Sequence, residues 1–314
     1  MHRTLSAAGA FWLAAFTYFI WGFTFLASRI AQDYGTPFVL LFWRFALAFV
    51  LLNLLRLTGR FPVRLHGRRL WPVLLAGLFE PVLYFPCEQY GLKLTSTSFS
   101  GVMVALIPLC SLVYGAVFLH EKATWRQVVF SVLSVAGVIV LAVYATGIGA
   151  GSFLGFLILL GTVFAGAGYI VACRACSGSF TAFERTYITC GMGAAAFGVL
   201  SVLEHRHGLS AVVLPMTHAP FALAIVFLSV VASVLSYLAL NRALEVLPVA
   251  RTAALINFST VVSVLAGVLL LREPFGWVSA VASAAILVGI WGVQRFAAPT
   301  VPDTAESTEP LPPS

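Results

Sequence analysis

Two short stretches, LHEKATW at residues 119–125 and LREPFGW at residues 271–277, share a Glu-x-x-x-Trp spacing 152 residues apart. Each stretch follows one long apolar run and precedes another. At this offset, nine of the 51 positions of 92–142 are identical to those of 244–294. The pattern predicts an internal repeat, in which each copy places this turn between two apolar helices.

The composition around the repeat predicts an all-α integral membrane protein. The chain is 61% hydrophobic and 9% charged, with a mean hydropathy of +1.00. Soluble proteins are about 45–50% apolar and about 25% charged, so this chain could not cover a water-exposed surface. Its five cysteines are odd in number and scattered, which excludes a secreted disulfide scaffold.

The length of the apolar runs predicts ten transmembrane helices, because one span needs about 20 apolar residues. We interpret the first run as a retained helix, since a signal-peptide core is shorter, and cleavage is the minor alternative. The expected spans cover residues 10–30, 37–57, 70–90, 100–120, 126–146, 153–173, 183–203, 221–241, 251–271 and 275–295.

The ten spans divide into two sets of five, so the second set must enter the membrane from the opposite side. We therefore expect inverted five-helix repeats over 1–146 and 147–296, the architecture of many secondary transporters. Residues 297–314 are rich in proline and are expected to form a disordered cytoplasmic tail. Thirteen Lys and Arg residues fall on one side of these spans and four on the other. The positive-inside rule then places both termini in the cytoplasm. We expect the protein itself in the cell (inner) membrane.

Several short motifs resemble the EamA-type family of the drug/metabolite transporter superfamily. The resemblance covers roughly residues 10–295 and departs from the family at Thr260, where a proline equivalent to Pro108 is common. It implies ten helices, a central cavity and transport of small metabolites or drugs, with export favoured. The motifs are Tyr18–Phe25, Trp43–Phe45, Tyr90–Ser96, Ile107–Pro108, Phe118–Lys122 and Leu270–Pro274.

Polar and aromatic residues recur at helical spacing in repeat-related spans, which predicts faces turned away from lipid. Small polar residues also let helices pack closely, so both interpretations stay open for the serines of the eighth span. Asn257 is equally compatible with a substrate hydrogen bond and an interhelical tie. The predicted substrate-binding residues are Trp21, Thr24, Glu80, Tyr84, Glu88, Tyr169, Ser233, Ser236 and Asn257.

Glu80 is the strongest single candidate, because it lies near the middle of the third span, where an acid is expensive to insert. We predict that it couples transport to protons or pairs with a cationic group of the substrate. The alternative is a structural ion pair with Arg44, the only cation well inside a span. For Arg44 we favour a structural role over substrate binding. Pro81 and Pro86 are expected to interrupt the helix that carries Glu80.

The sequence predicts no enzyme, metal or cofactor site. Cys173 and Cys176 lack a second ligand pair, and the basic residues form no single patch for a nucleic acid. The predicted partners are a small-molecule substrate, such as an amino acid or amine, the lipid bilayer and protons. Without an ATP-binding motif, transport would use a gradient or exchange. A membrane-embedded enzyme acting on lipid or peptide, and a non-transporting scaffold, are the alternatives. The oligomeric state stays open.

Overall fold

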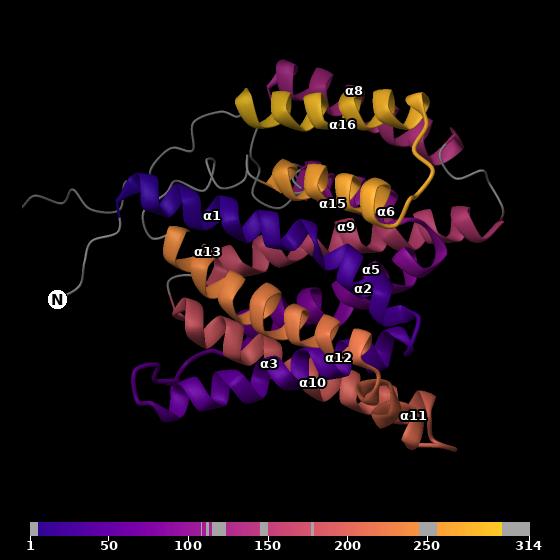
Figure 1. Cartoon of the computed structure of the whole chain (residues 1–314). Helices are drawn as coiled ribbons and strands as arrows, with labels where there is room; N and C mark the ends of the chain where they lie inside the picture. Colours follow the sequence, from indigo (N-terminus) through magenta and orange to yellow (C-terminus); the bar gives the residue numbers. More distant parts are fainter. Residues whose placement is uncertain are drawn as a thin grey trace, which may run out of the picture.

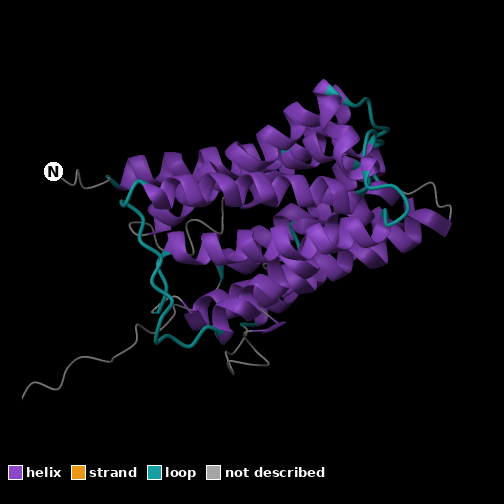
Figure 2. Cartoon of the chain, turned by 90° about the horizontal axis from the view of Figure 1, so that it is seen from below, coloured by secondary structure: helices purple, strands orange, loops and turns teal. Residues whose placement is uncertain are grey.

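The structure is a computed structural model of the 314-residue chain. It describes residues 6–107, 109–110, 113–114, 124–144, 150–176, 179–244 and 256–296. The described part is a bundle of roughly parallel and antiparallel helices (Figure 1), and its loops gather at the two ends of the bundle (Figure 2). The part of the chain that the structure describes holds no strand.

The first half supplies helices whose starts are set by simple caps. Thr36 accepts a hydrogen bond from the Val39 N–H ahead of α3, and Ser96 accepts one from the Phe99 N–H ahead of α6. These helices are α1 (Ala7–Gly22), α2 (Thr24–Gln32), α3 (Pro37–Leu57), α4 (Trp71–Gly77), the π-helix η1 (Leu78–Leu83), α5 (Tyr84–Leu94), α6 (Thr97–Val104) and α8 (Trp125–Tyr144).

The second half follows a similar order, but its first helix is continuous where α1 and α2 are separate, and two short helices follow α10. Its members are α9 (Ala150–Cys176), α10 (Ala182–Glu204), α11 (Ser210–Val213), the 3-10 helix η2 (Leu214–Thr217), α12 (Ala219–Val226), the π-helix η3 (Phe227–Leu235), α13 (Ser236–Leu244), α15 (Ile256–Leu270) and α16 (Trp277–Arg295).

Helices occur at the positions predicted from hydropathy, and the all-helical membrane class is confirmed. Four segments are long and apolar enough to cross a bilayer by length and composition: Ala8–Gln32, Pro37–Leu57, Ala182–Glu204 and Ala219–Leu240. Shorter apolar helices cover Trp125–Val140, Phe153–Tyr169, Phe258–Leu270 and Trp277–Val293. The count of ten crossings and the domain boundaries stay predictions, and the tail at 297–314 lies outside the described residues.

Helices α3 and α10, the second long helices of the two halves, run antiparallel along one edge of the bundle (Figure 1). Thr36, which precedes α3, donates a hydrogen bond of 2.6 Å to Glu204 at the end of α10. At the other end, Tyr187 near the start of α10 donates one of 2.9 Å to Asn53. Corresponding helices therefore point in opposite directions, as inverted repeats require.

Two more pairs of corresponding helices follow the same rule. The Gly101 carbonyl of α6 accepts from Thr260, and the Thr97 carbonyl accepts from Ser263, so α6 and α15 are antiparallel. In the α8–α16 pair, Gln127 bonds to the Val293 carbonyl and Ser134 to the Ile286 carbonyl. Both sets of bonds join later residues of one helix to earlier residues of the other.

The third long helix of each half is interrupted at a matching place. In the first half, Glu80 has non-helical dihedral angles (φ −140°, ψ 113°) inside η1. Moving η1 by 152 residues places it on residues 230–235, within η3. The expectation of a break at Pro81 is met, but Pro86 lies in the first turn of α5 and does not interrupt it. Proline fits there because the first helical turn needs no N–H donor.

Candidate functional site

A small cavity lies between the two halves, beside the interrupted helix of the first half. Its free volume is about 20 Å³, which is room for about one water molecule. A metabolite site needs several hundred Å³, so the cavity is too small to hold a metabolite in this conformation. The first half lines the cavity with Phe45, Glu80, Pro81 and Phe85, and the second half with Tyr169, Thr186, Thr189, Cys190 and Tyr237.

Glu80 reaches the cavity because the helix loses its regular geometry at this residue. Its Oε1 accepts a hydrogen bond of 2.5 Å from the Tyr237 hydroxyl, which belongs to α13 in the other half. The bond therefore joins residues 157 positions apart in the sequence. A π-helix within a span is frequent at functional sites, and interrupted backbone at membrane depth is tolerated where it lines a cavity.

Arg44 lies on α3, and only 3% of it is exposed. Its Nε donates a hydrogen bond of 3.2 Å to the Ser233 hydroxyl of η3. The guanidinium carbon lies 4.4 Å from the centroid of the Phe85 ring. Among the described residues, no carboxylate oxygen lies within 4.0 Å of an Arg44 nitrogen, so the structure shows no close ion pair with Glu80.

Glu88 forms a second polar group, two turns after Glu80 along α5. It is 3% exposed and accepts a hydrogen bond of 3.2 Å from the Gln89 side chain. Tyr84, one turn earlier, hydrogen-bonds to it as well. Gln89 also donates to Ser28 of α2, which ties α5 to the first helix pair. Glu88 therefore has more partners than Glu80.

The remaining predicted residues separate into those near the cavity and those bonded elsewhere. Tyr169 lines the cavity, and the Trp21 ring lies 5.2 Å from the Tyr237 ring, centroid to centroid. Thr24 donates to the Trp21 carbonyl and Ser236 to the Val231 carbonyl, so both hydroxyls bond within their own helical runs. The Asn257 side chain lies outside the described residues.

Three residues with clear roles were missed by the sequence analysis. Tyr237, the partner of Glu80, could have been found from its four-residue spacing after Ser233. Glu184 forms a capping box with Thr181, which is readable as the local Thr-x-x-Glu pattern. Glu273 was recognised only as a repeat marker, yet it accepts hydrogen bonds from the Thr97 and Ser98 N–H groups at the start of α6.

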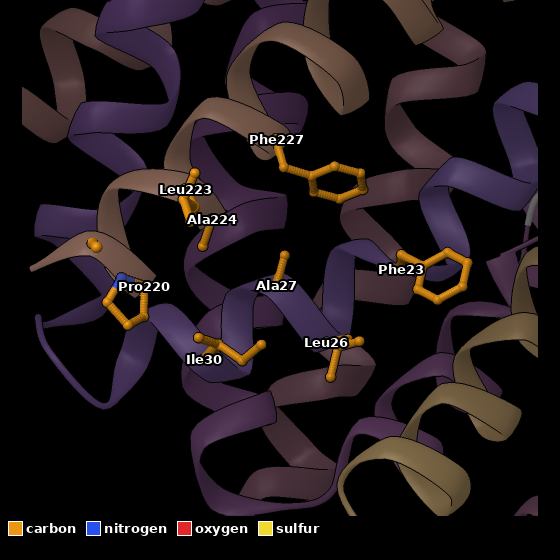
Figure 3. A pocket seen from close by; sticks show the side chains of 9 residues that line it. Phe23, Leu26, Ala27, Ile30, Pro220, Leu223, Ala224 and Phe227 are labelled. Atoms are coloured by element: carbon orange, nitrogen blue, oxygen red, sulfur yellow. The ribbon is translucent and has the colours of Figure 1, made fainter.

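A larger hollow of about 490 Å³ lies between α2 and α12, away from these polar groups (Figure 3). Its labelled side chains (Figure 3) are all apolar and come from α2 with the preceding Phe23, from α12, and from Phe227 of η3. Without a titratable or hydrogen-bonding side chain, it cannot orient a polar substrate. The smaller cavity is therefore the candidate functional site.

Comparisons with known proteins support a transporter. Residues 8–143 and, separately, 153–295 match the EamA-like transporter family. An uncharacterized transporter of Bacillus subtilis, YcxC, is 32% identical over 90% of this chain and 91% of its own length. An uncharacterized transporter of Archaeoglobus fulgidus is 26% identical over 90% and 97%. One crystal structure superposes with a TM-score of 0.64 at 19% identity, covering 92% of this chain and 98% of its own, and shows the shared fold.

Proposed function

Because the chain belongs to the EamA-like transporter family, we propose that the Glu80 cavity is the site at which it carries a small amine-bearing metabolite across the inner membrane. The substrate is an amino acid, an amine or a related compound. The direction is export, driven by proton coupling or by exchange. The observation that carries the proposal is the position of Glu80, an acid within a span that accepts a hydrogen bond from Tyr237 on a cavity wall shared by both halves.

The charges around the cavity favour a cation as cargo. The carboxyl groups of Glu80 and Glu88 and the guanidinium of Arg44 lie within electrostatic reach of one another in the described core. The Tyr84 and Tyr237 hydroxyls and the Cys190 thiol lie within reach of the same charges. With both acids ionised, this group carries one net negative charge in a medium where unpaired charge is expensive. A proton or a substrate ammonium neutralises it. Competition between these two cations for one carboxylate provides the coupling.

The inverted halves supply the mechanism of alternating access. Cavity residues come from α3, η1 and α5 on one side and from α9, α10 and α13 on the other. Rocking one half against the other opens the cavity first to one side of the membrane and then to the other. The Tyr237–Glu80 hydrogen bond crosses this interface, so it breaks or re-forms as the halves move.

Flux into proteoliposomes tests the proposal, with a panel of radiolabelled neutral amino acids and primary amines as probes. Wild type is expected to accumulate at least one probe when a pH gradient is imposed. Glu80→Gln should lower that flux about tenfold or more, because it removes a charge-assisted interaction. Glu204→Gln is the matched control, because Glu204 lies at the exposed end of α10.

Two results would contradict the proposal in different ways. If Glu80→Gln keeps the wild-type rate and pH dependence, Glu80 has no part in the mechanism. Absence of flux for every probe in wild type, together with product formation in a single compartment, would favour a membrane-embedded enzyme.

Orientation is tested separately by labelling single cysteines from outside intact cells. The loop at 59–69 and the segment at 205–207 lie at opposite ends of the α3–α10 pair, because Arg64 and Arg68 contact Glu184 near the start of α10. In a cysteine-free background, His207→Cys should react with an impermeant maleimide and Arg60→Cys should not. Equal labelling of both cysteines would contradict the inverted insertion of the two halves and the cytoplasmic position of the termini.

A further inference from the structure

Arg44 is a buried cation whose hydrogen-bonding capacity is only partly used. Its Nη1 is buried and has no hydrogen-bond partner, while its Nε is bonded to Ser233. A guanidinium has five N–H donors in a rigid fork, and buried charges in proteins are normally paired. With no carboxylate oxygen within 4.0 Å among the described residues, the charge of Arg44 has no directly contacting anion.

The helix facing Arg44 carries a second unused donor. The Ser229 hydroxyl is fully buried and has no hydrogen-bond partner. Ser229 lies four residues before Ser233 in η3, and a π-helix has about 4.4 residues in each turn, since its hydrogen bonds join i and i+5. The two serines therefore share one face of η3, the face that Arg44 contacts through Ser233.

Two aromatic rings lie against the guanidinium. Its central carbon lies 4.4 Å from the Phe85 centroid and 5.6 Å from that of Phe45. Both phenylalanines also line the Glu80 cavity, so the cation stands directly behind the cavity wall. A fixed fork in a low-dielectric setting binds a planar anion more strongly than the same group does in water.

We propose that Arg44, Ser229 and Ser233 form a subsite for a carboxylate group of the transported molecule. This inference rests on the proposed transport function and narrows its substrate to an ampholyte, with an ammonium at Glu80 and a carboxylate at Arg44. An ampholyte has no net charge, so the one net negative charge of Glu80, Glu88 and Arg44 is then neutralised by a proton. The anion carries a single charge, because Glu80 and Glu88 already place negative charge within electrostatic reach of Arg44 and would repel a dianion such as phosphate. The cavity opens toward Arg44 as the halves move apart.

Paired probes separate a carboxylate subsite from a purely structural arginine. Leucine with leucinamide, and phenylalanine with phenylalaninamide, differ in the carboxylate charge and keep the ammonium that Glu80 would hold. Binding to the purified full chain in detergent is measured by calorimetry. Wild type should bind at least one acid about tenfold or more tightly than its amide, as expected for hydrogen bonds to a charged group.

Substitution at Arg44 should change the ratio of the affinity for the acid to the affinity for its amide. It should not simply weaken the binding of both probes. In Arg44→Gln the acid and its amide should bind equally, while Arg44→Lys should keep part of the preference. Arg56→Gln is the control, because Arg56 is an exposed arginine of the same helix. If Arg44→Gln does not fold, Ser229→Ala and Ser233→Ala take its place and should each lower the acid-to-amide ratio.

The proposal is overturned if wild type binds acid and amide equally, if it binds neither member of either pair, or if Arg44→Gln keeps the wild-type preference. These outcomes differ from failure of the transport proposal. Proton-driven flux of an amine that depends on Glu80 would uphold transport even where the carboxylate subsite is lost.

Discussion

Two glutamates at the interface between the halves differ sharply in the number of donors that reach them. The Glu273 carboxylate, in the loop after α15, accepts three bonds, from Thr97 N–H at 2.6 Å, Ser98 N–H at 2.9 Å and Ser98 Oγ at 2.7 Å. Within the described part of the chain, Glu80 accepts one hydrogen bond, from Tyr237. A carboxylate with all its oxygens satisfied holds two segments together. A carboxylate that accepts few hydrogen bonds is available to a proton or a ligand.

The contrast extends to geometry, because Glu273 caps a helix and Glu80 interrupts one. Negative charge is favoured at a helix N-terminus, where N–H groups lack partners, and Glu273 meets α6 at that end. Glu80 sits in the middle of its span at a break in the helix, and its hydrogen-bond donor, Tyr237, comes from another helix. We therefore expect substitutions at Glu273 to change stability and substitutions near Glu80 to change transport.

The largest effect on stability is predicted for Glu273→Ala. It leaves two N–H groups of α6 without an acceptor and leaves the Ser98 hydroxyl only its longer bond of 3.4 Å to the Val264 carbonyl. The loss should cost about 2–4 kcal/mol of unfolding free energy. Thermal unfolding of the detergent-purified protein measures the loss. Glu204→Ala, at an exposed carboxylate, should change the melting temperature far less. Equal melting temperatures for wild type and Glu273→Ala would show that the cap does not join the halves.

A smaller loss of stability is predicted for Gly267→Ala, which tests the Glu273 contact from the α15 side. A methyl group at this position would meet the Glu273 carboxylate and the Ser98 hydroxyl. The carboxylate must shift and weaken its bonds, at a cost of about 1–3 kcal/mol. Gly276→Ala is the control, because nothing lies within 4 Å of a methyl group there. If both variants melt at the same temperature, the close approach is not needed.

The smallest effect on stability, with a clear effect on transport, is predicted for Tyr237→Phe. It removes the hydroxyl that bonds to Glu80 and should lower the unfolding free energy by about 0.5–1.5 kcal/mol. The flux should fall, and its pH dependence should shift, because the carboxylate loses its partner in the closed state. Tyr34→Phe, at a half-exposed tyrosine, is the control. Unchanged flux in Tyr237→Phe would separate the hydrogen bond from transport.

The sequence predicted the positions of the helices because a bilayer demands long apolar runs, and such runs are visible without any tertiary contact. Glu80 was found for the same reason, since an acid in a span is costly and therefore conspicuous. The opposite direction of corresponding helices followed from the odd number of spans in each half, but their side-by-side pairing was not predicted. These features depend on local composition and on whether the number of spans in each half is odd or even.

Partners across the interface could not be predicted, because they depend on how the halves pack. Tyr237 and Glu80 are 157 residues apart, and Glu273 and Thr97 are 176 apart. The π-helix η3 was also missed, since it contains no proline to mark it. Its widened turn accompanies the bond from the Ser236 hydroxyl to the Val231 carbonyl five residues earlier. For Arg44 the sequence favoured a structural role, because an arginine in a span can reach outward or pair. Its unpaired Nη1 depends on packing and was not visible in the sequence.

The antiparallel α3–α10, α6–α15 and α8–α16 pairs have an electrical consequence. Each helix carries a macrodipole along its axis, and two antiparallel neighbours of similar length largely cancel. The scaffold therefore has little net dipole across the bilayer for a membrane voltage to act on. Voltage instead does work on the charges that change sides with each cycle, at about 2.3 kcal/mol for each elementary charge per 100 mV. The cargo and its protons, and not the moving helices, determine whether the cycle is electrogenic.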